Sequence, residues 1–269
     1  MIRNPCVAGQ FYPRSKDALL NEVRALVGSG ARKESAFGIV SPHAGYMYSG
    51  FVAGSIFASI TPKPVYVIMG PNHTGIGEVF GLDPSESWKT PLGEVKIDKA
   101  LAARIKDNCK DIKDDDLSHA HEHSIEVQLP FLQYLQKDFK FVPITVSYAA
   151  LDSYKKVGKA IAKSVKDLKL EKDVTIIASS DMTHYESQDS AKKKDAAAIE
   201  AVLELNEDKL IRNIAELDIS MCGYGPTAIM IVAAKELGAK GARLVKYQTS
   251  GDVTGDYSSV VGYAGIIVT

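Results

Sequence analysis

The alternation of short apolar segments with longer helical segments constrains the fold of this 269-residue chain more than any other feature. The segments FGIVS (residues 37–41), VYVIM (65–69) and VTIIAS (174–179) lack the polar alternation of a half-exposed strand. Strands of this kind are buried on both faces, which requires helices on both sides of a largely parallel sheet. The sequence therefore predicts an α/β fold with a mostly parallel central sheet flanked by helices.

The segments around these three strands predict the other elements. Helical periodicity is clearest in residues 151–168, where Val157, Ile161 and Val165 share one face. Further helices are expected at residues 50–60, 99–106, 124–135, 190–205, 208–217 and 226–237. Further strands are expected at residues 78–82, 139–146, 243–249 and 259–268, with a hairpin around Gly93.

The sequence makes three further local predictions. The last two strands could pair antiparallel at an edge of the sheet. Pro130 either lies in the first turn of its helix or kinks that helix. The polar stretch 106–116 is predicted to be a solvated surface loop.

Composition excludes several classes of protein. The chain has 32 Lys+Arg and 33 Asp+Glu, a net charge of −1, so it lacks the positive excess of a nucleic-acid-binding protein. No apolar run approaches the roughly 18 residues of a membrane span, and the start MIRNPCVAGQFYP has no signal-peptide core. The cysteines are odd in number and far apart, which favours a reducing compartment. We expect a cytoplasmic protein with one domain over residues 1–269, no nucleic-acid partner and no membrane partner.

Histidines follow the three buried strands. His43, His73 and His184 each lie within a few residues of a strand's carboxyl end, where open α/β sheets bind their ligands. The other three histidines lie in the segment HAHEH at residues 119–123. A single histidine after a strand is usually satisfied by a backbone hydrogen bond. Three of them favour a metal site, a catalytic site or both, because imidazole is a common metal ligand and general base.

Cys222 lies in the segment MCGYGP, just before a predicted helix. A thiol near a helix N-terminus has a lowered pKa, which would suit it to bind a metal or to react. The alternative is a small buried hydrophobic residue. Two histidines and one cysteine would form a three-ligand site with an open position, which suits iron, copper or zinc. Cys6 and Cys109 have no comparable context.

Other motifs are less specific. If a helix begins at His123, Glu126 lies on the same face and could form a metal-binding or acid/base pair; a solvated loop is the alternative. The arm at residues 9–13 is predicted to pack on the domain as a strap. Ser179 and Ser180 precede an aspartate and a histidine, but the chain has no GxSxG elbow and no glycine-rich phosphate loop.

Taken together, the motifs resemble one known family. The chain contains RNPCVAGQFYP, SPHAGYMYSG, GPNHTG, EHSIEVQLPFLQ, SSDMTHY and MCGYGP, and the match extends to the closing VVGYA. This combination resembles the Memo family, the protein B component of the AmmeMemoRadiSam group. That family is similar in fold to the class III extradiol dioxygenases, non-haem Fe(II) enzymes that open catechol rings. The resemblance implies a single Memo-like α/β domain with a dioxygenase-like fold.

The resemblance also implies roles for individual residues. It suggests that His43, His73 and Cys222 bind the metal, with Cys222 in the position where the dioxygenases have a glutamate. A thiolate there changes the charge donated to the metal and makes the ligand oxidisable. Four residues are implied in catalysis: His184 as acid/base, Asp181 as an additional ligand or orienting group, and His121 and His123 as residues of the same cleft.

We therefore expect a mononuclear non-haem site with redox or dioxygenase-like chemistry on an unknown small molecule or peptide. Fe(II) is the favoured ion, with copper or zinc as alternatives. Animal members of the family resemble metal-binding redox and signalling proteins that engage phosphotyrosine peptides. Two other functions stay open: a non-enzymatic module that binds a peptide or small anion, and a zinc hydrolase with His184 or Glu126 as base. Enzymatic activity and oligomeric state also stay open.

Overall fold

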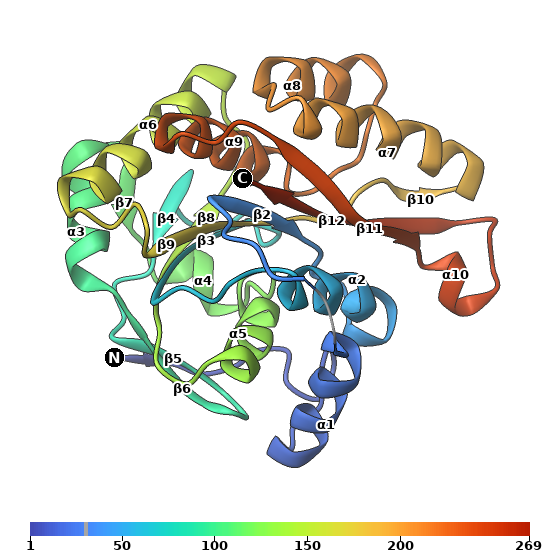
Figure 1. Ribbon diagram of the computed structural model, residues 1–269, viewed down its shortest axis with the longest axis horizontal. Coiled ribbons are helices and arrows are strands. Elements are labelled where there is room, and N and C mark those ends of the chain that lie inside the picture. The colour runs from blue at the N-terminus through green and yellow to red at the C-terminus, as the bar shows by residue number, and fades with distance from the viewer. Residues whose placement is uncertain (30–31) are drawn as a thin grey trace.

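The computed structural model describes residues 1–29 and 32–269. Within these residues, twelve strands pair into one sheet, with the main order β1-β5-β6-β8-β3-β9-β2-β12-β10 (Figure 1). Strand β11 pairs with β12, and β4 pairs with β7 and β8. The strands are β1 (Ile2–Arg3), β2 (Gly38–Ser41), β3 (Val65–Pro71), β4 (Phe80–Leu82), β5 (Ser87–Thr90), β6 (Gly93–Ile97), β7 (Ile112–Asp114), β8 (Lys140–Val146), β9 (Val174–Ser179), β10 (His184–Glu186), β11 (Ala242–Thr249) and β12 (Val260–Val268).

Strands β8, β3, β9 and β2 form the parallel centre of the sheet. Met69 of β3 lies opposite Ile144 of β8 and Ala178 of β9, and Ser41 of β2 lies opposite Ser179 of β9. Every residue of β2, β3 and β9 is buried. The uninterrupted apolar runs therefore mark strands covered on both faces, as expected.

Helices cover both faces of this sheet (Figure 1). Helices α1, α2 and α5 pack together on one face, and α6, α8 and α9 pack on the other, with α7 beside β11 and β12. The helices are α1 (Lys16–Val27), α2 (Tyr46–Ala58), α3 (Lys99–Asn108), α4 (Leu117–Ala120), α5 (Leu129–Leu135), α6 (Leu151–Asp167), α7 (Gln188–Leu203), α8 (Glu207–Glu216), α9 (Tyr224–Leu237) and α10 (Gly251–Thr254), together with the 3-10 helix η1 (Glu126–Gln128). In this described part of the chain, no helix combines the length and apolarity that crossing a membrane requires.

The fold settles two of the local predictions and corrects a third. Pro130 lies in the first turn of α5, where its missing N–H has no helical partner to lose. Strands β11 and β12 do pair antiparallel, but β12 also pairs antiparallel with β2 and so lies inside the sheet. The prediction that residues 106–116 form a solvated loop is wrong. Strand β7 occupies part of it, and Cys109 and Ile112 are buried, because the two apolar residues of this polar run face the core.

The predicted strap at residues 9–13 packs on the domain, where Tyr12 is buried, and a buried ion pair holds the residues before it; residues 3–13 are called the N-terminal arm below. A guanidinium nitrogen of Arg3 lies 2.6 Å from the carboxylate of Glu126, and both side chains are almost fully buried. Glu126 also accepts hydrogen bonds from the backbone N–H groups of Cys6 and Val7 and from the Tyr12 hydroxyl. Glu126 is therefore committed to the arm, and the structure contradicts the expectation that it pairs with a histidine or acts as a base.

The charge of Glu126 makes the stability of the fold depend on pH. Burial opposes its ionisation, but the Arg3 charge and the hydrogen bonds outweigh burial and hold the pKa of the Glu126 carboxyl below its ordinary value. A carboxyl whose pKa is lower in the folded state stabilises the fold above its ordinary pKa. This stabilisation is lost as the pH falls through the lowered value.

Replacing Glu126 should therefore destabilise the protein at neutral pH. In Glu126→Gln we expect the free energy of unfolding at pH 7 to fall by about 3–5 kcal/mol, because Arg3 is left buried without a counter-charge. The variant should also lose less stability than the wild type as the solution is acidified. Urea unfolding at a series of pH values measures both effects. The control is Glu86→Gln, whose exposed carboxylate lies 3.5 Å from Lys99 and should contribute less than about 1 kcal/mol; equal effects would contradict the assignment.

Candidate metal centre

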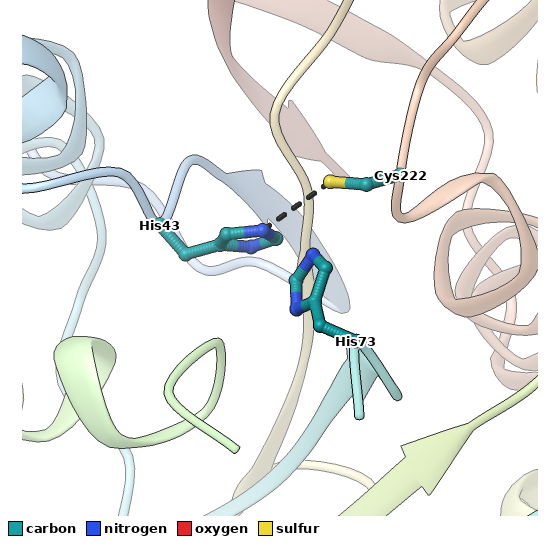
Figure 2. A group of neighbouring side chains, drawn as sticks. All are labelled: His43, His73 and Cys222. Atoms are coloured by element: carbon teal, nitrogen blue, oxygen red, sulfur yellow. Dashed lines mark hydrogen bonds between the residues drawn. The ribbon is translucent and has the colours of Figure 1, made fainter. Parts of the chain in front are cut away.

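Two imidazoles and one thiol converge at the carboxyl edge of the parallel strands (Figure 2). The ligand atoms of His43, His73 and Cys222 all lie within 4.8 Å of one another, so this group could hold a metal ion. Nε2 of His43 is 3.2 Å from Sγ of Cys222. The three residues come from the loop after β2, the loop after β3 and the segment before α9. The structure thus brings together the three residues that the family resemblance implied as ligands.

Two glycines allow these segments to approach so closely. A Cβ at Gly223 would collide with the backbone oxygen of Ser179 and the side chain of Ser180, at the end of β9. A Cβ at Gly70 would collide with the side chain of Ser124, which follows the HAHEH segment. The missing side chain leaves room for the backbone of Ser179 at Gly223 and for the side chain of Ser124 at Gly70. The residue after Cys222 and the end of β3 are therefore constrained by packing against the site.

Hydrogen bonds fix the His43 ring with one nitrogen free. Nδ1 of His43 is 2.9 Å from the Ser179 hydroxyl, which itself donates to the Ser124 carbonyl and accepts from Gln128. Because the Ser179 proton is committed to that carbonyl, Nδ1 of His43 must be the donor. Nε2 is then the unprotonated nitrogen and faces the thiol. Burial, with the neighbouring His73 and His123, holds the pKa of His43 well below its usual range, so the ring is neutral.

Glu122 orients the second imidazole. Its carboxylate accepts the backbone N–H of His73 at 2.7 Å and lies 3.0 Å from Nδ1 of the same residue. Burial favours a neutral His73, but the hydrogen bond and charge of Glu122 outweigh it and raise the pKa of the imidazole. The same interactions outweigh the burial of Glu122 and lower the pKa of its carboxyl to about 2. A carboxylate on Nδ1 leaves Nε2 for the metal, which is the usual arrangement around metal-bound histidines.

The thiol of Cys222 is protonated in the metal-free protein. Burial, with the nearby charge of Asp181, raises the pKa of the Cys222 thiol. The prediction of a lowered pKa next to a helix N-terminus is therefore wrong here, because desolvation outweighs the effect of the helix. The proton lies between Sγ and the unprotonated Nε2 of His43, and a bound metal would replace it.

Asp181 and His184 lie on the wall of the same site. Oδ1 of Asp181 accepts the backbone N–H of His43 at 2.7 Å, so this carboxylate positions the His43 loop. Burial raises the pKa of the Asp181 carboxyl to about 6. Nδ1 of His184 lies 2.9 Å from the Ser220 carbonyl, to which it must donate, and this leaves Nε2 as a proton acceptor. Among the described residues, neither Asp181 nor His184 belongs to the group of possible metal ligands formed by His43, His73 and Cys222.

The three histidines of the HAHEH segment have different environments. His123 lines the site, with its ring 4.8 Å from that of His73 and 4.6 Å from that of Phe11. His119 is fully buried against Trp88 and belongs to the core. His121 is exposed and is not among the residues that line the cavity, so the structure does not bring it to the cleft as predicted. Helix α4 ends at Ala120, so the regular helical spacing does not continue through His121 and His123.

A cavity of about 790 Å³ opens in front of the three candidate ligands. Part of its wall comes from residues that the sequence analysis did not single out as site residues. They are Phe11, Ala44, Gly45, Tyr48, Tyr185, Ser220, Ser250, Thr254, Asp256, Ser259, Val261 and Tyr263. Several of them lie in the motifs that carry the family resemblance, but no residue type or spacing marked them as site residues. Glu122, between two histidines, was a sequence signal of an orienting carboxylate.

Comparison with known proteins matches almost the whole chain to one family. Residues 3–267 match the family described as Memo-like protein. The chain is 44% identical to a MEMO1 family protein of Methanopyrus kandleri, with 99% of each chain covered. It is 46% identical to one of Methanococcoides burtonii, which covers 99% of this chain and 100% of the relative. It is 42% identical to one of Methanocaldococcus jannaschii, with 99% of each chain covered. These names state a family and no reaction.

The geometry around Glu122 predicts an effect on metal binding. Glu122→Gln keeps the size of the side chain but removes the charge that orients His73, so the affinity for Fe(II) or Zn²⁺ should fall about 10–100-fold. Competition with a coloured chelator under anaerobic conditions measures this change. Glu94→Gln, at an exposed carboxylate that accepts a hydrogen bond from Ser87, is the matched control. Equal affinity in the wild type and Glu122→Gln would show that Glu122 does not support the site.

Proposed function

The chain belongs to the Memo-like protein family, and on that premise we propose that it is a metal-dependent redox protein with a single iron or copper ion. The proposed ligands are His43, His73 and Cys222. The observation that carries the proposal is the convergence of their ligand atoms within 4.8 Å at the base of a large cavity.

The chemistry of the donor set fits such an ion. Hydrogen bonds to Ser179 and Glu122 occupy Nδ1 of His43 and His73, so each ring offers Nε2. Two imidazoles with a thiolate suit iron, copper or zinc, and the sulfur favours the softer ions. Three protein ligands beside a cavity also leave room for a substrate or water, as in catalytic rather than structural metal sites. Fe(II) is the ion we favour.

The surrounding residues supply binding and proton transfer. A bound iron or copper ion would contribute electron transfer and dioxygen chemistry, and the resemblance to extradiol dioxygenases suggests a dioxygenase-like reaction. His184 has Nε2 available as a base, since its Nδ1 donates to Ser220. His123 lies beside His73 and is kept neutral by burial, which lowers its pKa. These two imidazoles can take or return a proton at the cavity wall while Asp181 holds the His43 loop.

Cys222 provides the direct test of the ligand set. With anaerobically purified protein, Cys222→Ser should bind Fe(II) or Cu at least about 100-fold more weakly, because a serine hydroxyl does not ionise as a thiol does. Titration followed by metal analysis measures the affinity and the stoichiometry of about one ion per chain. Cys6→Ser, at a thiol outside the cavity, should bind as the wild type does. Unchanged affinity in Cys222→Ser would remove the thiol from the site.

His184 tests the redox part of the proposal. Fe(II)-loaded protein should consume oxygen with a member of a panel of aromatic diols. His184→Asn should lower that rate about 100-fold or more without changing the metal affinity. His121→Asn, at the exposed histidine, is the control and should be active. If His184→Asn and the control both keep the wild-type rate of oxygen consumption, His184 is not the base.

Two outcomes would support the other functions. Absence of oxygen consumption with Fe(II) bound would contradict the dioxygenase-like reaction, and isolation with zinc and hydrolysis without oxygen would support a hydrolase instead. Ligand binding that is indifferent to a chelator would support a non-enzymatic binding module.

A further inference from the structure

The wall of the cavity beyond the metal ligands has an unusual balance of side chains. It contains the aromatic rings of Phe11, Tyr48, Tyr185 and Tyr263. Its acids are Asp181 and Asp256, and in the described residues no lysine or arginine lines it. Sites that recognise phosphate or carboxylate groups generally use arginine or lysine. The wall therefore offers aromatic faces and negative charge, and no fixed positive charge from the protein itself.

Tyr263 offers a hydroxyl that the protein does not use. Its side chain comes from β12, is 2% exposed and lines the cavity. Other buried tyrosines bond to the protein: Tyr12 donates to Glu126 and Tyr46 donates to the Val127 carbonyl. Among the described residues, no group forms a hydrogen bond with the Tyr263 hydroxyl. The hydroxyl is not among the fully buried side-chain atoms that lack a partner, so it reaches the cavity and is available to a ligand there.

Tyr185 is held on the cavity wall by a distorted backbone. It has a φ of 60°, in the left-handed region that aromatic residues rarely adopt, and it lies at a register shift between β10 and β12. Its side chain is 79% exposed although it lines the cavity. Strain and bulges of this kind often re-aim a side chain at a functional site. Here they place a phenol ring at the cavity next to His184.

Asp256 adds the negative charge. It lies in the connection between α10 and β12, where Oδ1 accepts hydrogen bonds from the backbone and hydroxyl of Ser258. These bonds lower the pKa of the Asp256 carboxyl, so it is ionised at neutral pH. Because Oδ1 takes both bonds, Oδ2 can face a ligand cation. The carboxylate is exposed, so its effect on binding is modest.

We propose that the cavity binds a small aromatic ligand that bears an ammonium group, with Tyr263 and Asp256 as specificity-determining residues. The ring would pack among the aromatic side chains, the Tyr263 hydroxyl would donate to a polar group of the ligand, and the ammonium would lie near aromatic faces and Asp256. The inference rests on the proposed function, because it names the substrate class of that same site. It also disfavours the small anions that the sequence analysis left open.

Three probes of the same size separate the effect of charge. Tyramine, para-ethylphenol and para-hydroxyphenylacetate share a phenol ring and differ in carrying an ammonium, a neutral or a carboxylate group. Calorimetric titration of the full chain should give the tightest binding for tyramine and the weakest for the carboxylate, with a ratio of about tenfold between them. Carboxylate binding as tight as that of tyramine would overturn the proposal, as would the absence of saturable binding for all three.

Two variants test the named residues. Tyr263→Phe should weaken all three probes about fivefold without changing the urea midpoint, because the lost hydroxyl has no partner in the protein. The control, Tyr46→Phe, removes a bonded hydroxyl outside the cavity and should lower stability without changing binding.

Asp256→Asn should weaken the binding of tyramine about threefold and leave the binding of para-ethylphenol unchanged. The control, Asp138→Asn, at an exposed aspartate outside the cavity, should change the binding of neither probe. If probe binding is unchanged in both Tyr263→Phe and Asp256→Asn, these two residues do not determine specificity.

The titrations are carried out on metal-free and on metal-loaded protein. A bound cation attracts carboxylates directly, so the metal-free protein reports the preference of the wall alone. If titration shows that the wild type binds no metal, the proposed function fails, and the order of the three probes still tests the cavity. If the metal binds as proposed and the order is reversed, the substrate class is wrong and the metal site stands.

Discussion

The parallel pairing of β2, β9 and β3 is the constraint on which the rest of the structure depends. These strands are buried on both faces and lie side by side, so their carboxyl ends meet at one edge. The loops that follow carry His43, His73 and the segment from Ser180 to His184 to that edge. Cys222 reaches the same place because Gly223 allows its segment to pack directly against the end of β9.

Two buried glutamates four residues apart connect the edge of the sheet to the rest of the molecule. Glu122 faces the site and holds His73, while Glu126 faces away and holds Arg3 and the N-terminal arm. Arg3 also donates to the carbonyl of Glu122, and Phe11 of the arm packs on His123. The arm therefore helps to support the site, and the N-terminal motif and the histidine motifs stabilise the same part of the molecule.

The fold and the candidate site residues could largely be predicted because their signals are local, whereas the choice of His43, His73 and Cys222 as ligands came from the resemblance to a known family. Apolar runs revealed the central strands, and residue type with position after a strand revealed His43, His73 and His184. The failures involved the direction of side chains and their solvation. His121 and Glu126 lie in a turn and a 3-10 helix whose geometry no spacing rule specifies. The pKa of the Cys222 thiol depends on how much water the packed segments exclude.

The sequence by itself determined the layered α/β architecture, the edge that carries the site and the residue types available there, because hydrophobic periodicity and donor chemistry are properties of short segments. Only the tertiary structure decided which nitrogen of each imidazole is free, which carboxylate supports the site and which the arm, and which residues line the cavity. Those outcomes arise from contacts between residues far apart in the chain: Ser179 with His43, Glu122 with His73, and β12 with the loop that carries His184. Burial and hydrogen-bond geometry exist only once these segments pack together.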